Sequence, residues 1–258
     1  MAAKKKEKAV VVSQKELTTG IYDLTLKTSL EISAPGQFIS IYTNDASKLL
    51  PRPISICDAG NGTLRMVYRV AGEGTKQFSK LKASDELDIL GVLGNGFDIS
   101  VAKGKKVLVF GGGIGIPPML GLCKTLKNEG IDVTAVLGYR NNDMFLKAEF
   151  DEVAKVYVAT EDGSVGTKGN VLDAVKENGL SGDVLFSCGP MPMLRALKYF
   201  AQENNMKAYI SLEERMACGV GACLGCVCKT TKKDEHSQVN NARICTDGPV
   251  FDAEEVDL

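Results

Sequence analysis

Five of the eight cysteines of this 258-residue chain lie close together near its carboxyl end, and their spacing limits the possible folds of that region. Cys218, Cys223 and Cys226 are followed by Cys245, which gives the spacing C-x4-C-x2-C-x18-C. The first three positions match the plant-type [2Fe-2S] ligand spacing. Glycines and an alanine lie between these ligands, so backbone N–H groups can turn toward the sulfur atoms. No helix of useful length is expected from Glu213 onward, and the sequence therefore predicts a small loop domain stapled by a metal centre.

Other uses of these thiols remain open from the spacing alone. Four thiolates also suit a structural zinc ion, although a zinc ribbon normally carries two short C-x2-C arms. Disulfides are disfavoured because the remaining cysteines, Cys57, Cys123 and Cys188, are scattered. The apolar run at residues 9–12 is too short for the core of a secretion signal, so a reducing cytoplasm is expected. A fifth thiol, Cys228, is interpreted as a bystander rather than a spare ligand.

Composition and charge exclude several classes of function. Apolar residues make up 44% and charged residues 24% of the chain, which are ordinary globular values. Thirty-one basic and 32 acidic side chains give a net charge of −1, so there is no general attraction to nucleic acid or to an anionic membrane. No apolar run approaches the length of a membrane-spanning helix. The single histidine, His236, lies in a polar stretch, which argues against a Ser-His-Asp triad or a histidine metal centre.

Two different patterns divide the rest of the chain. Short segments bounded by Gly, Pro, Asn and Asp predict a small antiparallel β-barrel, with strands at 9–12, 22–27, 38–43, 54–57, 63–70 and 86–90 and one helix at 75–81. Strands then alternate with helices, which predicts an α/β domain with a parallel sheet covered on both faces. Its expected strands are 107–110, 133–138, 153–159, 184–187 and 208–212, and its helices are 118–128, 170–177 and 191–203. The expected domains are therefore 1–101, 102–212 and 213–258.

Two glycine-containing turns are expected at the carboxyl ends of parallel strands. The first contains Gly111, Gly112, Gly113 and Gly115, and the second contains Cys188, Gly189 and Pro190. Glycine lets a backbone approach a pyrophosphate, whose charge is met by the following helix N-terminus. The first turn is not a strict G-x-G-x-x-G, and a tight turn without a ligand remains an alternative. Together the two turns predict a cleft that binds a dinucleotide.

The barrel carries weaker signals, at Arg52-Pro53-Ile54-Ser55 and in the stretch from Arg69 to Thr75. An arginine can bind a phosphate in bidentate fashion, and a serine hydroxyl can donate to a flavin ring nitrogen. Taken alone, these residues are better explained as an exposed ion pair and a surface hydroxyl than as a flavin site.

The order of the motifs along the chain resembles that of a known family. The sequence is similar to the electron-transfer subunits of dihydroorotate dehydrogenase B, within the wider ferredoxin-NADP reductase-like family. The similarity runs through Arg-Pro-Ile-Ser, Gly-Glu-Gly-Thr, Leu93-Gly94-Asn95-Gly96-Phe97, the first glycine turn, Cys-Gly-Pro, and a cysteine loop that ends in Cys245-x-Asp247-Gly248-Pro249-Val250-Phe251. It covers essentially the whole chain, and Val92 stands where relatives usually carry proline. The resemblance implies an FAD-binding barrel, a nicotinamide-binding α/β domain and a C-terminal [2Fe-2S] domain.

The resemblance also implies residue roles. Arg52 would bind the FAD phosphates, and the flavin ring would lie against Pro53, Ile54 and Ser55 and be lined by Arg69, Val70 and Ala71. Gly74 and Thr75 would place a helix start at the pyrophosphate. The cluster ligands would be Cys218, Cys223, Cys226 and Cys245. Cys188 is expected either to approach the nicotinamide or to serve as a buried structural thiol.

The implied reaction is electron transfer from NADH through FAD and the cluster, without a conventional catalytic residue. The implied acceptor is a separate FMN-containing dihydroorotate dehydrogenase catalytic subunit of pyrimidine biosynthesis, in a heterotetramer with two copies of each chain. Two alternatives remain open: a related redox subunit that serves ferredoxin or hydrogenase, and a zinc-stapled nucleotide-binding regulator. Arg140 could accept the 2′-phosphate of NADPH, but Asp143 would repel it, and the resemblance favours NADH.

Overall fold

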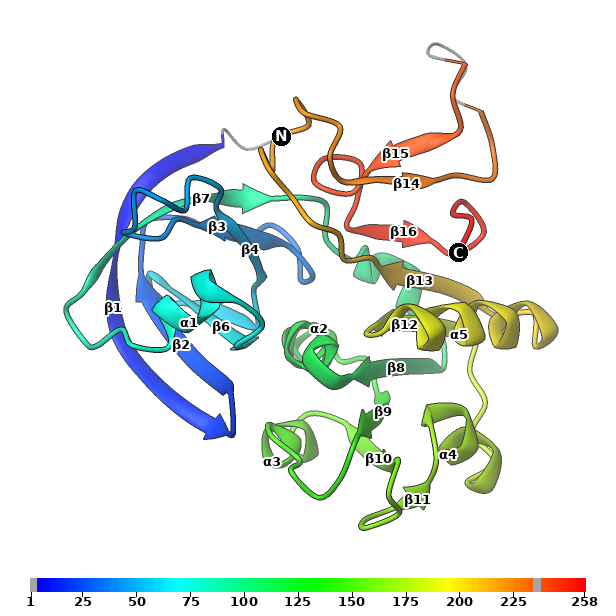
Figure 1. Ribbon diagram of the computed structural model, residues 1–258. Coiled ribbons are helices and arrows are strands. Elements are labelled where there is room, and N and C mark those ends of the chain that lie inside the picture. Colours follow the sequence, from blue (N-terminus) through cyan, green and yellow to red (C-terminus); the bar gives the residue numbers. More distant parts are fainter. Residues whose placement is uncertain (1–3, 234–237) are drawn as a thin grey trace.

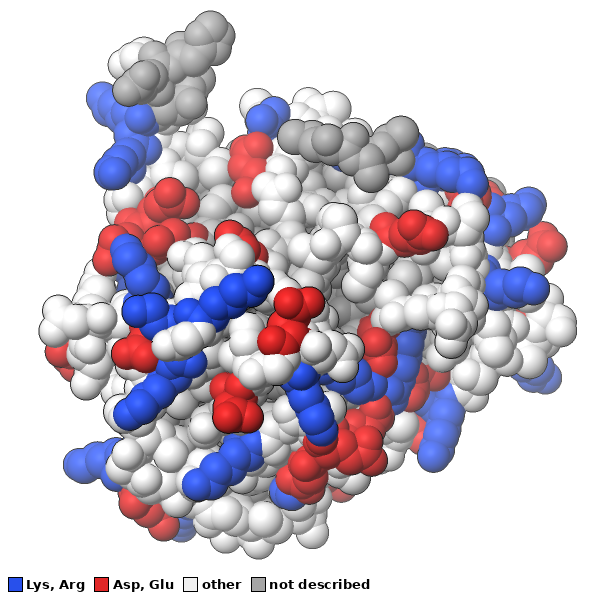
Figure 2. Space-filling model, turned by 180° about the vertical axis from the view of Figure 1, so that it is seen from behind, with Lys and Arg blue, Asp and Glu red and all other residues white. Residues whose placement is uncertain are grey.

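The computed structural model describes residues 4–233 and 238–258, so His236 lies outside the described residues. Two seven-stranded sheets form most of the molecule, and a small two-stranded hairpin lies near the carboxyl end of the chain (Figure 1). Among the described residues, no helix is long and apolar enough to span a bilayer. Figure 2 shows basic and acidic side chains interspersed over one face of the molecule, in keeping with its net charge of −1.

The first sheet is antiparallel throughout and has the strand order β4-β3-β7-β1-β2-β6-β5. Its strands are β1 (Lys5–Thr18), β2 (Ile21–Lys27), β3 (Phe38–Ile41), β4 (Arg52–Ser55), β5 (Asp58–Gly60), β6 (Thr63–Arg69) and β7 (Glu86–Leu93). The sheet curls so that β4 also contacts β6, and apolar side chains from alternate positions fill its inside. The short helix α1 (Glu73–Phe78) is anchored by Phe78, whose ring meets Tyr68 edge-on with 6.2 Å between the ring centroids. This is the antiparallel barrel architecture that the sequence predicts.

Some boundaries differ from the predicted ones. Strand β4 covers Arg52–Ser55 rather than 54–57, because pairing with β3 sets its register from Ile41↔Arg52 to Phe38↔Ser55. Proline is tolerated at residue 53 because β4 is an edge strand. Helix α1 begins two residues earlier than expected and ends at Phe78, and further turns follow it up to Leu81. Strand β1 is much longer than the predicted 9–12, because it pairs with both β2 and β7 despite its many charged residues.

The second sheet has the order β11-β10-β9-β8-β12-β13-β16 and is parallel except for its last strand. Its strands are β8 (Val107–Gly112), β9 (Val133–Tyr139), β10 (Lys155–Thr160), β11 (Thr167–Lys168), β12 (Val184–Cys188), β13 (Lys207–Ser211) and β16 (Val250–Asp252). Every residue of β8 is buried, as expected for a strand covered on both faces. One face packs against α2 (Ile116–Asn128) and α3 (Lys147–Asp151), and the other against α4 (Val171–Glu177) and α5 (Met191–Glu203). The predicted α/β architecture is therefore present.

The carboxyl-terminal segment contacts both sheets. It contains the hairpin β14 (Val227–Lys229) and β15 (Asn241–Arg243), and its last strand, β16, pairs antiparallel with β13 of the second sheet. On the barrel side, the backbone N–H of Asn95 donates to Gly248 O at 2.7 Å. Strand β16 was not predicted, because three residues carry too little pattern to indicate a strand. The loop segment is thus held in place by both preceding parts of the chain.

Charged side chains join the barrel to the α/β part. Arg65 of β6 donates to Asp23 of β2 and to Glu149 of α3, with N–O distances of 2.6–3.1 Å. Lys124 of α2 lies 2.5 Å from Asp58 of β5 and 3.4 Å from Glu149. The hydrogen bond from Arg65, which outweighs partial burial, lowers the pKa of Glu149. This network fixes how the two sheets sit relative to each other.

Candidate functional site

The two predicted glycine turns lie directly against each other. Strands β8 and β12 are neighbours, with Gly111 paired to Cys188, so the turns that follow them meet at one edge of the sheet. A Cβ added to Gly115 would overlap the carbonyl group of Cys188 and lie 2.6 Å from Gly189 N. A Cβ at Gly189 would in turn lie 3.1 Å from Gly112 Cα. Close packing of one turn on the other therefore already requires glycine at position 115 and leaves little room for a side chain at position 189.

Gly113 differs from the other glycines of this turn. Its φ is +52°, and an added Cβ would meet no atom within 4 Å. It therefore faces open space at the point where a nucleotide backbone is expected. The helix start that follows is poor in donors, because Pro117 and Pro118 carry no N–H. Phosphate binding here would depend on the turn itself more than on the N-terminus of α2.

Cys188 lies at the end of β12 and is partly exposed. Desolvation raises the pKa of its thiol to about 12, and a contact with the Ser211 side chain offsets only part of this effect. The thiol is therefore neutral near pH 7. This protonation state suits a packing role beside a bound ring and does not suit a nucleophile or an acid-base group.

Several of the predicted flavin residues meet at the start of α1. The Arg52 side chain crosses over Gly74 so closely that an added Cβ would lie 2.5 Å from Nε. The Arg52 guanidinium also donates to the carbonyl of Leu50. Thr75 Oγ1 accepts from the backbone N–H groups of Ala71 at 2.9 Å and of residue 72 at 3.2 Å. The start of α1 therefore combines the positive charge of Arg52 with an ordered turn, and both features suit the binding of a phosphate group.

The side chains of the other residues predicted to contact the flavin point to two different faces of the barrel. Ile54 and Val70 pack against the inner core of the barrel. Because side chains alternate along a strand, Pro53 and Ser55 point to the opposite face of β4. Arg69 ends β6 and is exposed. The structure therefore brings part of the predicted set together at α1 and places another part on the outer face of β4.

The cysteine loop turns its backbone N–H groups toward sulfur. Cys218 Sγ accepts from Val220 N at 3.4 Å and from Ala222 N at 3.3 Å, and Cys223 Sγ accepts from Gly225 N at 3.4 Å. Burial opposes ionisation of Cys218, but these N–H groups and the neighbouring Cys223 outweigh it and lower the pKa to about 6. The loop is thus shaped to stabilise a thiolate.

The four predicted ligands form two pairs. Cys218 lies within hydrogen-bonding reach of Cys223, and Cys226 lies within reach of Cys245. In the described part of the chain, no three His, Cys, Asp or Glu side chains converge as ligands of a single metal ion do. A [2Fe-2S] cluster needs a different arrangement, with two protein ligands on each of its two irons. The two pairs of thiols fit that requirement.

The two pairs differ in their surroundings. Cys226 and Cys245 are buried in a core that also contains Phe38 and Leu93 of the barrel. Burial, followed by the contact with Cys226, raises the pKa of Cys245 to about 11. Cys223 is exposed. A cluster held by all four thiols would therefore have one side toward the barrel and one side toward solvent.

Further residues hold the loop without having been predicted as part of the site. Arg243 is paired with Asp247 at 3.1 Å and also donates to Gly221 O at 3.4 Å. Asn95 of the barrel donates from Nδ2 to the carbonyls of Thr246 at 3.2 Å and Asp247 at 3.0 Å. In the sequence, Asn95 is marked only by its place in the motif Leu93-Gly94-Asn95-Gly96-Phe97, which gives no sign of a contact with the cysteine loop. Cys228, in turn, lies in the hairpin opposite Ala242, and burial raises the pKa of its thiol.

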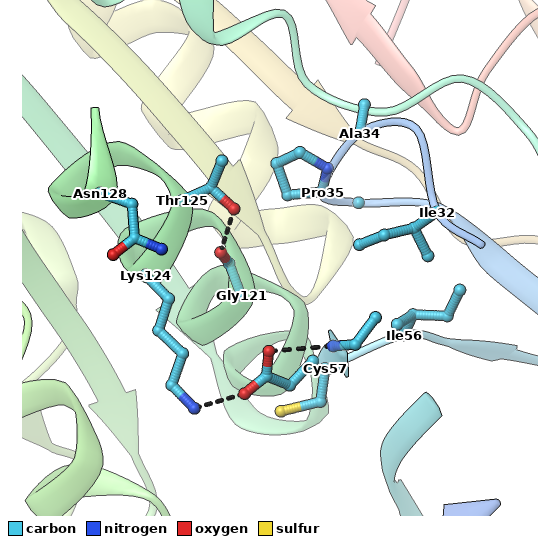
Figure 3. A pocket seen from close by; sticks show the side chains of 12 residues that line it. Ile32, Ala34, Pro35, Ile56, Cys57, Gly121, Lys124, Thr125 and Asn128 are labelled. Atoms are coloured by element: carbon cyan, nitrogen blue, oxygen red, sulfur yellow. Dashed lines mark hydrogen bonds and ion pairs between the residues drawn. The ribbon is translucent and has the colours of Figure 1, made fainter. Parts of the chain in front are cut away.

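A cavity of about 120 Å³ lies between α2 and the barrel loops (Figure 3). Its wall includes Pro35, Ile56 and Thr125, and the Lys124–Asp58 ion pair lies along it. None of the residues predicted to bind a cofactor lines it. Its volume suits a few water molecules and is too small for a dinucleotide.

Comparison with protein families identifies two segments of the chain. Residues 213–257 match the iron-sulfur cluster binding domain of dihydroorotate dehydrogenase B. Residues 109–199 match the oxidoreductase NAD-binding domain. These segments contain the four paired thiols and the two glycine turns, respectively.

Comparison with individual proteins extends the similarity over the whole chain. The dihydroorotate dehydrogenase B (NAD(+)), electron transfer subunit of Geobacillus sp. (strain WCH70) is 43% identical over 261 residues, which cover 98% of this chain and 99% of that protein. The subunit of the same name from Bacillus cereus (strain G9842) is 44% identical over 260 residues, with the same coverage. A solved NADH-dependent reduced ferredoxin-NADP oxidoreductase superposes with a TM-score of 0.84 at 27% identity, over 96% of this chain and 89% of that one. A ferredoxin NADP+ reductase from Neisseria gonorrhoeae shares the fold, with a TM-score of 0.67 at 15% identity over 82% of this chain and 94% of that one. The chain thus belongs to the family of electron transfer subunits of dihydroorotate dehydrogenase B (NAD(+)).

Proposed function

We propose that the chain oxidises NADH and passes the electrons to an FMN-containing dihydroorotate dehydrogenase catalytic subunit in pyrimidine biosynthesis. The observation that carries this proposal is the arrangement of four thiols in two pairs beside a flavoprotein-like barrel. When bound, FAD accepts two electrons together as a hydride and releases them one at a time, and a [2Fe-2S] cluster carries single electrons. The chain contributes binding and orientation rather than an acid-base residue.

The geometry above supports the following proposed roles. Arg52, beside Gly74 at the start of α1, binds the FAD phosphates. Pro53 and Ser55, on the outer face of β4, lie against the flavin ring. Gly113 leaves open space for the nucleotide, and the neutral thiol of Cys188 packs beside the nicotinamide.

We propose NADH rather than NADPH as the donor because of the charge at the ends of β9 and β10. Arg140 directly follows β9 and is the cation predicted to be able to accept a 2′-phosphate. Its carbonyl accepts from the backbone N–H of Asp162 at 3.2 Å, which brings the acidic residues Glu161 and Asp162 close to it. Asp143 lies on the same loop as Arg140. Three acidic residues close to Arg140 along the backbone make this edge of the sheet unfavourable for a 2′-phosphate.

An electron transfer subunit implies a catalytic partner subunit, and we propose a heterotetramer with two copies of each chain. The proposed docking surface is the exposed side of the cysteine loop, where Leu224 is 62% exposed beside Cys223. Val220 and Val227 extend this apolar surface, at 36% and 39% exposed. Apolar residues around the outer thiol pair suit a protein partner.

All eight cysteines are free, which supports the proposed location in a reducing cytoplasm.

Metal and flavin analysis of the chain purified without air tests the proposal. We expect iron, acid-labile sulfide and FAD, together with faster dye reduction by NADH than by NADPH. Co-expression with the FMN-containing subunit should give an assembly that reduces NAD+ with dihydroorotate. Zinc in place of iron, or a chain that elutes alone in that co-expression, would contradict the proposed function.

A further inference from the structure

Ser40 lies in the middle of β3 and presents an unexplained polar group. The residue is fully buried, and its Oγ has no hydrogen-bond partner among the described residues. Among the described residues, only one other buried side-chain polar atom lacks a hydrogen-bond partner, the Oγ of Ser187. A buried hydroxyl without a partner lowers stability, so its presence calls for a partner that the protein chain does not provide.

The strand geometry shows which way Ser40 faces. Its neighbours Ile39 and Ile41 are fully buried in the inner core of the barrel, so Ser40 points to the outer face. Across the strands it is paired with Pro53 of β4 and with Leu90 of β7. Ser40 therefore shares a face with Pro53, which we have assigned to the flavin ring.

The cysteine loop covers this outer face. An added Cβ at Gly219 would lie 3.1 Å from Ser40 Oγ and 3.3 Å from Leu93 Cδ1. Gly219 directly follows Cys218, and Leu93 belongs to the same core as Cys226 and Cys245. The orphaned hydroxyl is thus located between the proposed flavin strand and the thiol loop.

We propose that the Ser40 hydroxyl donates a hydrogen bond to a sulfur atom of the bound [2Fe-2S] cluster and thereby raises its reduction potential. This inference rests on the cluster of the proposed function. Thiolate and sulfide sulfur atoms accept hydrogen bonds, and such bonds are among the groups that set the potential of a cluster. Reduction adds negative charge, so a donor stabilises the reduced state more than the oxidised state. Ser40 acts as a positioning and tuning residue, not as a catalytic one.

The test is a redox titration of the full-length protein with its cofactors. Cluster reduction is followed by electron paramagnetic resonance and flavin reduction by visible absorption. Ser40→Ala should lower the midpoint potential of the cluster by about 59 mV, which is a tenfold shift in a one-electron equilibrium, and should leave the flavin potential unchanged. Ser187→Ala is the matched control, because it removes the other orphaned hydroxyl, from β12 of the second sheet. An unchanged cluster potential in Ser40→Ala, or an equal shift in Ser187→Ala, overturns the proposal.

A second pair of variants decides the question if Ser40→Ala does not accumulate with its cluster. Ser40→Thr keeps an O–H donor, whereas Ser40→Cys keeps a similar size with a much weaker donor. The proposal requires a lower cluster potential in Ser40→Cys than in Ser40→Thr, and equal potentials overturn it. Wild-type protein without iron and sulfide would instead overturn the proposed function itself. A cluster that is present but indifferent to these changes overturns only the role of Ser40.

Discussion

Substitutions in the first glycine turn can separate glycines that serve packing from a glycine that serves nucleotide binding. Gly115 has an ordinary helical φ of −79°, so alanine causes no backbone strain there. The new Cβ would nevertheless overlap the Cys188 carbonyl and lie 2.6 Å from Gly189 N, both of them backbone groups that cannot rotate away. The two turns would have to separate. Such overpacking costs about 1–3 kcal/mol, so Gly115→Ala should lower the unfolding midpoint clearly.

Gly113→Ala should behave differently. Its φ of +52° makes alanine strained by about 1 kcal/mol, but the new Cβ meets nothing within 4 Å. Gly130→Ala is the matched control, because Gly130 has a φ of +72° and also has open space around it. It follows the carboxyl end of α2, away from both turns. The two variants should therefore lose similar stability, while only Gly113→Ala should raise the KM for NADH.

The assays are thermal unfolding of the cofactor-loaded protein, followed by circular dichroism, and steady-state dye reduction over a range of NADH concentrations. Two results would contradict these assignments of the glycines. A wild-type midpoint in Gly115→Ala would show that the two turns are not in the close contact described. Equal KM values in Gly113→Ala and Gly130→Ala would show that Gly113 does not face the nucleotide.

Three further substitutions test the cluster loop and the junction between the sheets. Cys223→Ser should abolish incorporation of the cluster, measured as iron and sulfide content, while leaving part of the NADH-to-dye activity through FAD. Gly219→Ala should also reduce cluster content, because its φ of +67° strains alanine and the new Cβ would lie 3.1 Å from Ser40 Oγ; full iron content would contradict this. Arg65→Met should lower the free energy of unfolding by about 2 kcal/mol near pH 7, because it removes the hydrogen bonds from Arg65 to Glu149 and to Asp23. The pKa of Glu149 is lowered in the folded state. The stability gained from its pairing with Arg65 is therefore fully present above the pKa of Glu149 in the unfolded chain, near 4.3, and is lost as the pH falls through the lower pKa of the folded protein. Denaturation curves of wild type and variant should therefore converge in acid.

The parts of the fold that the sequence predicts best are those with a strong local pattern. Helix α5 spans Met191–Glu203 as expected, because Leu194, Leu197 and Ala201 repeat on one buried face and Pro190 precedes its first turn. The exposed, charged strand β1 was underestimated, because its length depends on pairing with two other strands. Local pattern thus predicts elements well where one face of the element is buried, and poorly where a partner strand defines the element.

In the candidate site, too, features with a local sequence pattern could be predicted, and features set by distant parts of the chain could not. The N–H groups around Cys218 follow from small residues between the ligands, which the sequence displays directly. Ser40 could not be foreseen, because a serine within Phe-Ile-Ser-Ile gives no sign that a loop from the opposite end of the chain covers it. The packing of Gly115 on Cys188 was also hidden, since a glycine required by another turn looks the same in sequence as a glycine required by a phosphate.

The position of the fourth thiol explains how a loop-rich segment keeps a fixed place beside the barrel. Residues 246–251 follow Cys245 directly, and they are held from outside the loop: Asn95 donates to the carbonyls of Thr246 and Asp247, and β16 pairs with β13. Cys245 is fully buried as a result. Cys218 and Cys223, by contrast, are oriented by N–H groups of their own loop. The fold therefore fixes one thiol pair against the barrel, whereas the outer pair depends on local turns. This arrangement places the rigid side of the site next to the proposed flavin strand and the adaptable side next to the proposed partner surface.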